Sequence, residues 1–400
     1  MVSFKPHTQS RRRTPYSPAC AARTRSALLS LPHELLFKIA THVVAMPGTM
    51  PASSLISAKP AWRTSIAGLA NASRDTRDAA LRAWFRILVL RDEDDWGIVL
   101  AVFSAIRFSV REIYVHSRAV SPSTPPDALL SFPALLSAHI NAHNDVTFDP
   151  RIGYTYYTLL PHIPRGLKRL AIAHAHAPDG ERLESLVCAS RTGDGIQLEE
   201  LRLGRCTLFD CATEGCSYWP AFPHDHDAYF SDDGAVEYAS SIAQDLLPLR
   251  SLRVLHLGVY LTPHIALSTH QHHHAPFMHH TALSPININA HPHVIPANGH
   301  LGPVNHLLPL PVPVPPPHHL HLLHHPHHRA PLHCPSLWAS PCAACQVQFG
   351  PATKVAEHAA CTVLGGMLPW IEEISWAGYF ERYGKGVSRW ARGRDDWVRR

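Results

Sequence analysis

Apolar residues recur along the chain in a six-residue pattern that predicts β-strands. The pattern has apolar residues at positions 1, 4 and 6, as in Leu198-x-x-Leu201-x-Leu203. Stretches with this pattern begin at residues 85, 110, 135, 167, 198, 252 and 371. Because side chains of a strand alternate between two faces, we expect positions 1, 4 and 6 to point into a core and positions 3 and 5 to face the open side.

Helical patterns occupy four of the gaps between these stretches. They cover residues 96–103, 183–189, 236–247 and 353–367. Strands that alternate with helices favour a parallel sheet, since a parallel pair needs a crossover between its two strands. The closing strand is expected at residues 371–380. The sequence therefore predicts an α/β protein.

The strand pattern also resembles the leucine-rich repeat. Residues 198–206 match the strand template of that repeat through position 9, where Cys206 stands. The first five stretches begin 25 to 32 residues apart, which is near the length of one strand-and-helix unit. The two later gaps are longer, and each contains an inserted segment that does not fit the repeat pattern. The resemblance implies an irregular leucine-rich-repeat-like solenoid, in which stacked units bury a shared core.

A helical pattern near the beginning of the chain is interrupted once. Leu35, Ile39 and Val43 are spaced four residues apart and predict one apolar face of a helix. Pro32 suits the first turn of such a helix, where its missing N–H is not needed. A second helical stretch begins near residue 69. Together the two stretches predict a small helical region ahead of the first strand.

These two stretches resemble the F-box, the short three-helix motif of ubiquitin-ligase substrate adaptors. The matching residues are Leu31-Pro32-x-Glu34-Leu35-Leu36-x-x-Ile39 and Leu69-Ala70-x-x-Ser73-Arg74-x-x-Arg77. The link across residues 45–66 is longer than the motif usually allows and contains three prolines, which leaves the middle helix open. The layout of the whole chain, with a tryptophan-containing tail, is similar to that of fungal (basidiomycete-type) F-box proteins.

The F-box resemblance implies a function and two sets of contact residues. The F-box would dock a Skp-type linker protein of a cullin ubiquitin ligase, and the repeat domain would bind an unknown target protein. The alternative is a linker-independent repeat scaffold. The residues expected to contact the linker are Leu31, Pro32, Leu35, Leu36, Ile39, Val43, Leu69, Ser73, Arg74 and Leu81. The exposed strand positions expected to bind the target are Tyr114, His139, Arg169, Arg202 and His256.

Composition narrows the classes of partner. Charged residues make up 17% of the chain and the net charge is +5, which does not suggest a dedicated nucleic-acid binder with basic residues clustered on one face. The longest apolar run is far short of the ~20 residues that a bilayer span requires. Nine irregularly spaced cysteines fit a reducing compartment. We expect no nucleic-acid or membrane partner and an intracellular location, cytoplasmic and/or nuclear.

Two segments differ in composition from the rest of the chain. Residues 1–27 are basic and predict a disordered tail. Residues 262–331 are dense in histidine and proline and predict a disordered insertion, whose histidines should bind metal ions weakly. The expected domains are residues 28–84 for the F-box-like motif, 85–261 for the repeat-like domain and 332–400 for the C-terminal repeat and tail.

Familiar catalytic motifs are missing from the sequence. It contains no GxSxG, HExxH, Walker loop or GxGxxG, and an adaptor needs no catalytic group. We therefore expect no enzymatic activity and no cofactor.

The cysteines near the end of the chain raise the question of a metal site. Cys342-x2-Cys345-x12-His358-x2-Cys361 begins with zinc-finger spacing, although its last gap is shorter than usual. A zinc-dependent nucleic-acid binder would use this set. The favoured interpretation is no metal, with both cysteines as small buried residues ahead of a repeat helix. The inward face of that helix would consist of Val355, Ala359 and Val363.

Overall fold

The structure is a computed structural model that describes residues 31–45, 66–143, 148–149, 153–175, 180–187, 196–206, 234–273 and 342–400, with short gaps in several of these ranges. The expected basic tail, most of the 45–66 link and most of the expected insertion lie outside the described residues. The chain divides into two compact units, residues 1–87 and 88–400. Within the described ranges, no helix is both long enough and apolar enough to cross a membrane.

The described part of the first unit is helical. Its elements are α1 (His33–Ala45), α3 (Ala67–Ala72) and α4 (Arg74–Trp84). The side chains between them are mostly alanines, which are short and let the helix backbones approach closely. These core residues are Ala40, Val44, Ile66, Ala70, Ala80 and Ala83.

A capping box starts α4. The Ser73 hydroxyl accepts a hydrogen bond from the Thr76 amide at 3.1 Å, and the Thr76 hydroxyl accepts one from the Ser73 amide at 2.9 Å. Arg77 Nε then donates to the Ala70 carbonyl of α3 at 2.9 Å. These contacts satisfy backbone groups that a helix end leaves free. The Ser-Arg-x-x-Arg spacing therefore has a local role in joining α3 to α4.

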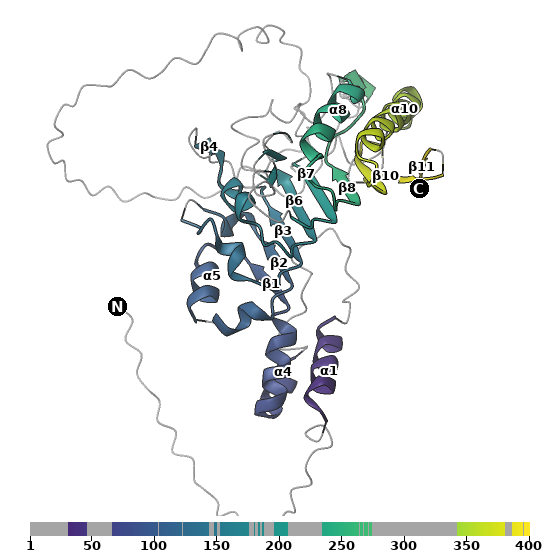
Figure 1. The fold of residues 1–400 in the computed structure, drawn as a ribbon. Coiled ribbons are helices and arrows are strands. Elements are labelled where there is room, and N and C mark those ends of the chain that lie inside the picture. The colour runs from purple at the N-terminus through teal and green to yellow at the C-terminus, as the bar shows by residue number, and fades with distance from the viewer. Residues whose placement is uncertain are drawn as a thin grey trace, which may run out of the picture. The chain divides into compact units, whose positions relative to one another are not determined.

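The second unit is built on a nine-stranded sheet whose strands follow one another in sequence order (Figure 1). The strands from β2 to β9 are parallel, and β10 and β11 continue the sheet antiparallel. The protein is therefore of mixed α/β class with one mostly parallel sheet. The strands are β1 (Ile87–Leu90), β2 (Glu112–Val115), β3 (Ser137–Asn141), β6 (Arg169–Ala175), β7 (Glu200–Arg205), β8 (Val254–Leu257), β9 (Glu373–Gly378), β10 (Gly386–Arg392) and β11 (Trp397–Arg399). A separate two-stranded sheet pairs β4 (Phe148–Asp149) with β5 (Gly153–Tyr154).

All seven predicted strands are present. Each one begins two residues after the first apolar residue of its pattern. Positions 4 and 6 of every stretch are at most 4% exposed, so the prediction is confirmed for these positions. Position 1 is buried in every stretch except the first, where Phe85 is half-buried. Position 4 is held by Leu88, Ile113, Ala138, Leu170, Leu201, Leu255 and Ile374, and position 6 by Leu90, Val115, Ile140, Ile172, Leu203, Leu257 and Trp376.

The tail after the predicted closing strand forms two further strands, which the sequence pattern did not predict. In β10, Ser388 and Trp390 are buried while Val387 and Arg389 are exposed. The residue types do not show this alternation, because apolar Val387 is exposed and polar Ser388 is buried, so the sequence carried no clear period-2 signal for the strand. The physical reason for the addition is that β9 would otherwise leave a row of unpaired backbone groups at the edge of the sheet.

Two helices, α8 (Ala235–Leu246) and α10 (Ala343–Met367), lie side by side in contact with each other (Figure 1). The ring of Tyr238 in α8 lies 6.4 Å from that of Trp376, and Trp376 Nε1 donates to Cys361 Sγ in α10 at 3.3 Å. Because Trp376 belongs to the inward face of β9, both helices cover that face. The helix predicted at residues 236–247 is confirmed, whereas the one predicted at 353–367 begins ten residues earlier, at Ala343.

The expected inward face of α10 is wrong. Val355 is 70% exposed, whereas Glu357 is only 2% exposed. The residues that α10 buries beyond its first turns are Thr353, Glu357, Ala360, Cys361 and Leu364. Polar Thr353 and Glu357 find hydrogen-bond partners inside the protein, so a search for an apolar face alone selects the wrong side.

The remaining connections are short helical segments. The predicted helix at residues 96–103 appears as α5 (Asp94–Gly97) followed by π-helical Ile98–Val102. Its Trp96 is buried, and the indole donates to the Ala119 carbonyl at 2.7 Å. The described residues of the predicted 183–189 helix are helical. Elsewhere the connections use 3₁₀ turns at Ser117–Ala119, Ala128–Ser131 and Thr155–His162.

Candidate functional site

The open face of the sheet carries a row of polar side chains across neighbouring strands. Parallel pairing places Tyr114 beside His139 and Arg202 beside His256, with Ala171 between these pairs. Neighbouring strands are about 4.8 Å apart, so such side chains form one continuous surface. We call this surface the polar band, and it consists of Glu112, Tyr114, His139, Arg169, Glu200, Arg202 and His256. The structure thus brings together all five residues expected to bind the target.

One half of the polar band combines stacked rings with an ion pair. The rings of Tyr114 and His139 are stacked, with centroids 4.5 Å apart and planes 4° from parallel. Arg169 reaches across to Glu112, with 3.6 Å between the guanidinium and the carboxylate. Burial, followed by the charge of Glu112, raises the pKa of Tyr114 above its usual value. Tyr114 therefore stays a neutral hydrogen-bonding group over the whole physiological range.

Glu200 is the centre of the other half. Its carboxylate accepts a hydrogen bond from Arg202 Nε and lies 3.8 Å from His256 Nε2. Burial first, and then the positive charge of Arg202, lower the pKa of both His139 and His256 to about 4. Both imidazoles are therefore neutral at pH 7. The two arginines of the band are offset by its two glutamates, which leaves a surface suited to hydrogen bonding and stacking.

Sequence reasoning missed one extension of the polar band. In β10, Arg389 pairs with Ser375, which in turn pairs with His256 of β8, so Arg389 continues the same row. Its positive charge helps to lower the pKa of His256. The hydrophobic pattern gave no signal for this residue, because the strand exposes apolar Val387 and buries polar Ser388.

In the first unit, α1 has two apolar stripes. Leu36 and Ala40 are buried at 3% and 0% exposed, and Val44 continues this inward stripe. Leu35 and Ile39, on the adjacent stripe, remain 43% and 39% exposed. Two apolar side chains one turn apart thus lie on the surface of a helix whose other apolar side is already packed.

The other residues expected to contact the linker differ in exposure. Leu36 lies in the core of the first unit, Leu69 packs against that core, and Ser73 caps α4. The remaining residues expose at least part of their surface: Leu31, Pro32, Val43, Arg74 and Leu81.

The alternative zinc set of Cys342, Cys345, His358 and Cys361 is not brought together. Cys345 and Cys361 lie on the one continuous helix α10, where sixteen residues at about 1.5 Å each correspond to about 24 Å. His358 instead pairs with Asp396, 3.0 Å from its Nε2, and Cys361 accepts from Trp376. A zinc finger has its cysteine pair on a separate turn that folds back toward the helix, whereas here the pair begins the helix itself. Cys342 and Cys345 lie instead beside His270 and His273.

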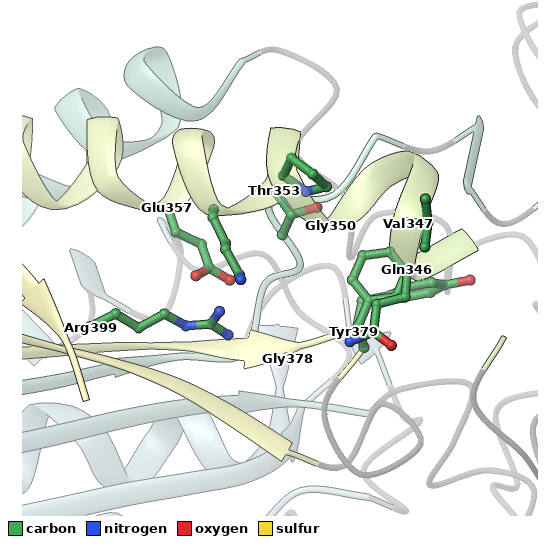
Figure 2. A pocket seen from close by; sticks show the side chains of 11 residues that line it. Gln346, Val347, Gly350, Thr353, Glu357, Gly378, Tyr379 and Arg399 are labelled. Atoms are coloured by element: carbon green, nitrogen blue, oxygen red, sulfur yellow. The ribbon is translucent and has the colours of Figure 1, made fainter. Parts of the chain in front are cut away.

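A pocket of about 400 Å³ lies between α10 and the strands β9 and β11 (Figure 2). Glu357 projects from α10 into it, above the side chain of Arg399 from β11 (Figure 2). The Glu357 carboxylate accepts hydrogen bonds from Ser388 Oγ at 2.6 Å and from Trp390 Nε1 at 3.0 Å. Arg399 Nε also donates to Ser388 Oγ, at 3.0 Å. Ser388 is only 2% exposed, and the three hydrogen bonds tie α10 to the β10–β11 hairpin.

No protein-family model matches the chain, and no curated protein matches it.

Proposed function

We propose that the protein is a substrate-recognition adaptor of a cullin ubiquitin ligase. Its first unit would act as an F-box that docks a Skp-type linker protein, and its sheet would act as an irregular leucine-rich-repeat-like solenoid that holds a target protein. The overall layout would be that of a fungal F-box protein. This role needs no catalytic group or cofactor, and it places the protein in the cytoplasm and/or the nucleus.

The observation that carries the proposal is the exposed apolar stripe of α1. A helix of a small unit normally turns its apolar residues inward, and α1 already does so with Leu36 and Ala40. Leu35 and Ile39 add a second stripe that faces outward. Both belong to the stretch that resembles the F-box, so an exposed stripe on the same helix supports a protein-docking role.

The energetics require a wider contact than these two side chains. Burial of Leu35 and Ile39 would contribute roughly 1.5–3 kcal/mol each. Association costs about 4–15 kcal/mol, so the roughly 3–6 kcal/mol from this pair offsets only the lowest part of that range. The exposed Pro32 and Arg74 and the half-buried Leu81 would supply the additional contact.

The sheet supports the second half of the proposal. Parallel strands that follow in sequence order each present one or two residues to the polar band, as expected of stacked repeat units. The neutral imidazoles, the Tyr114 ring and the paired arginines suit a polar protein surface with hydrogen-bonding groups. The target itself is not identified by this chemistry.

The test is co-purification with a Skp-type linker protein. The double variant Leu35→Asp and Ile39→Asp should reduce linker recovery at least about 100-fold, because it places two charges in an apolar contact. Circular dichroism and the thermal midpoint should stay near those of the parent, since both side chains are exposed.

Two further variants of α1 separate docking from folding. Lys38→Asp changes the charge on the same exposed surface and should leave most linker binding intact. Leu36→Asp places a charge in the core and should unfold the unit. Absence of linker from the parent preparation would refute the F-box proposal and favour a linker-independent scaffold. Retention of linker by the double variant would contradict docking through Leu35 and Ile39.

A further inference from the structure

The beginning of α10 lies beside a helical segment that precedes residues 274–341. That segment contributes His270 and His273, which are three residues apart and therefore lie on one side of a helix. Cys342 is the N-cap residue of α10, and Cys345 lies in its first turn. In each pair, two residues separate the two ligands. The histidine pair and the cysteine pair thus lie next to each other in the fold, although about seventy residues separate them in sequence.

Three of these side chains, those of His270, Cys342 and Cys345, lie close enough together to hold one metal ion, and His273 contacts both sulfurs. His273 Nδ1 lies 3.3 Å from the sulfurs of both Cys342 and Cys345. The ligand atoms of His270, Cys342 and Cys345 all lie within 4.8 Å of one another. In tetrahedral zinc, bonds of about 2.3 Å to sulfur and about 2.0 Å to nitrogen give nitrogen–sulfur edges of roughly 3.5 Å. The His273 distances agree with that edge.

The ligand types and their burial indicate the class of metal. Two thiolates and two imidazoles form a set that selects tetrahedral zinc. His270 and Cys345 are 4% and 0% exposed and Cys342 is half-buried, whereas His273 is exposed and lies on the solvent side of the cluster. Four protein ligands fill a tetrahedral site, so the role is structural and not catalytic.

We propose that His270, His273, Cys342 and Cys345 bind one structural zinc ion that joins the beginning of α10 to the preceding helical segment. The ion would fasten the two ends of residues 274–341 to each other. A clip that closes such a long stretch stabilises the folded state by restricting the unfolded chain. The site is independent of the proposed adaptor function and uses only two of the four residues that the sequence pattern suggested.

Cobalt(II) substitution in the full-length chain tests the site. The parent protein, reduced and freed of metal, should bind cobalt with a thiolate-to-cobalt charge-transfer band and tetrahedral d–d bands, and zinc should displace it at about one equivalent. The charge-transfer band reports sulfur ligation, so weak binding to other histidines of residues 264–333 does not contribute to it. Absence of the band from the reduced parent would refute the proposal.

Variants assign the ligands. Cys342→Ser should abolish most of the charge-transfer band, and His273→Gln, at an exposed position, should weaken cobalt affinity at least about 10-fold, with circular dichroism as the check that the variant folds. His358→Gln is the matched control, since it removes the histidine of the alternative set and should leave the spectrum unchanged. Loss of the band in His358→Gln, or an unchanged titration in His273→Gln, would overturn the assignment.

Discussion

The carboxylate of Glu357 lies inside the fold, between α10 and the β10–β11 hairpin. It accepts hydrogen bonds from Ser388 and Trp390, both of which are themselves buried. A buried donor that loses its acceptor costs about 1–3 kcal/mol, because it has given up water without compensation. Glu357 therefore helps to hold α10 in place against β10, and through Ser388 against Arg399 of β11.

Replacement of Glu357 by alanine should lower the free energy of unfolding by about 2–5 kcal/mol, since two buried donors lose their acceptor. Urea denaturation of the full-length chain measures this loss. Val355→Ala, two residues away on the exposed side of α10, should change stability by less than about 0.5 kcal/mol. Similar losses in both variants would contradict the burial that the structure assigns to α10.

Neighbouring strands act together on the two histidines of the polar band. His139 of β3 and His256 of β8 flank the arginines of β6 and β7, and β10 adds Arg389. Burial and these positive charges oppose protonation, whereas Glu200 favours it. The lowered pKa values are thus a property of the sheet and not of either strand alone.

This arrangement predicts a pH dependence of stability. In the folded state both histidines have a pKa of about 4, whereas an unfolded histidine has a pKa near ~6.5. Between these values the unfolded chain binds more protons, so each histidine should lower stability by up to about 1.4 kcal/mol per pH unit as the pH falls from 6.5 to 4. The stability that they contribute is fully present above about pH 6.5.

Thermal unfolding across that range tests the expectation. The double variant His139→Gln and His256→Gln should lose less stability than the parent on acidification. His162→Gln, at an exposed position outside the band, is the control and should follow the parent. Identical pH profiles for the parent and the double variant would show that other groups cause the decline.

At the scale of the whole molecule, the two compact units carry two different kinds of surface. The first unit offers the apolar stripe of Leu35 and Ile39, and the second offers the polar band. An adaptor must bind two proteins at once, so the two surfaces should be separable by mutation. The separation is itself a prediction of the proposed function.

Charge reversal in the polar band should impair target capture without affecting the linker. Arg202→Glu removes the partner of Glu200 and places two carboxylates together, so the recovery of co-purifying target proteins should fall several-fold while linker recovery stays constant. Quantitative mass spectrometry of both measures this. Arg253→Glu, an exposed position outside the band, is the matched control. Equal loss of linker and target in Arg202→Glu would indicate misfolding.

The hydrophobic pattern predicted which residues form strands better than it predicted the contacts that the strands and helices make. Seven strands and their buried faces followed from spacing alone, because a core-facing position tolerates few residue types. Residues 386–399 were missed, since a short strand beside an existing edge needs little apolar content of its own. That pattern also did not predict the alanine-rich packing of the first unit or the capping role of Ser73.

By itself, the sequence determined the α/β class, the strand positions and the row of side chains that became the polar band, because each depends on a local period of residues. Only the tertiary structure decided that Glu357 turns inward, that Leu35 and Ile39 remain outside, and that Cys342 and Cys345 meet His270 and His273. The physical reason is distance along the chain. Contacts between residues far apart in sequence depend on how the elements pack, and no local pattern encodes them.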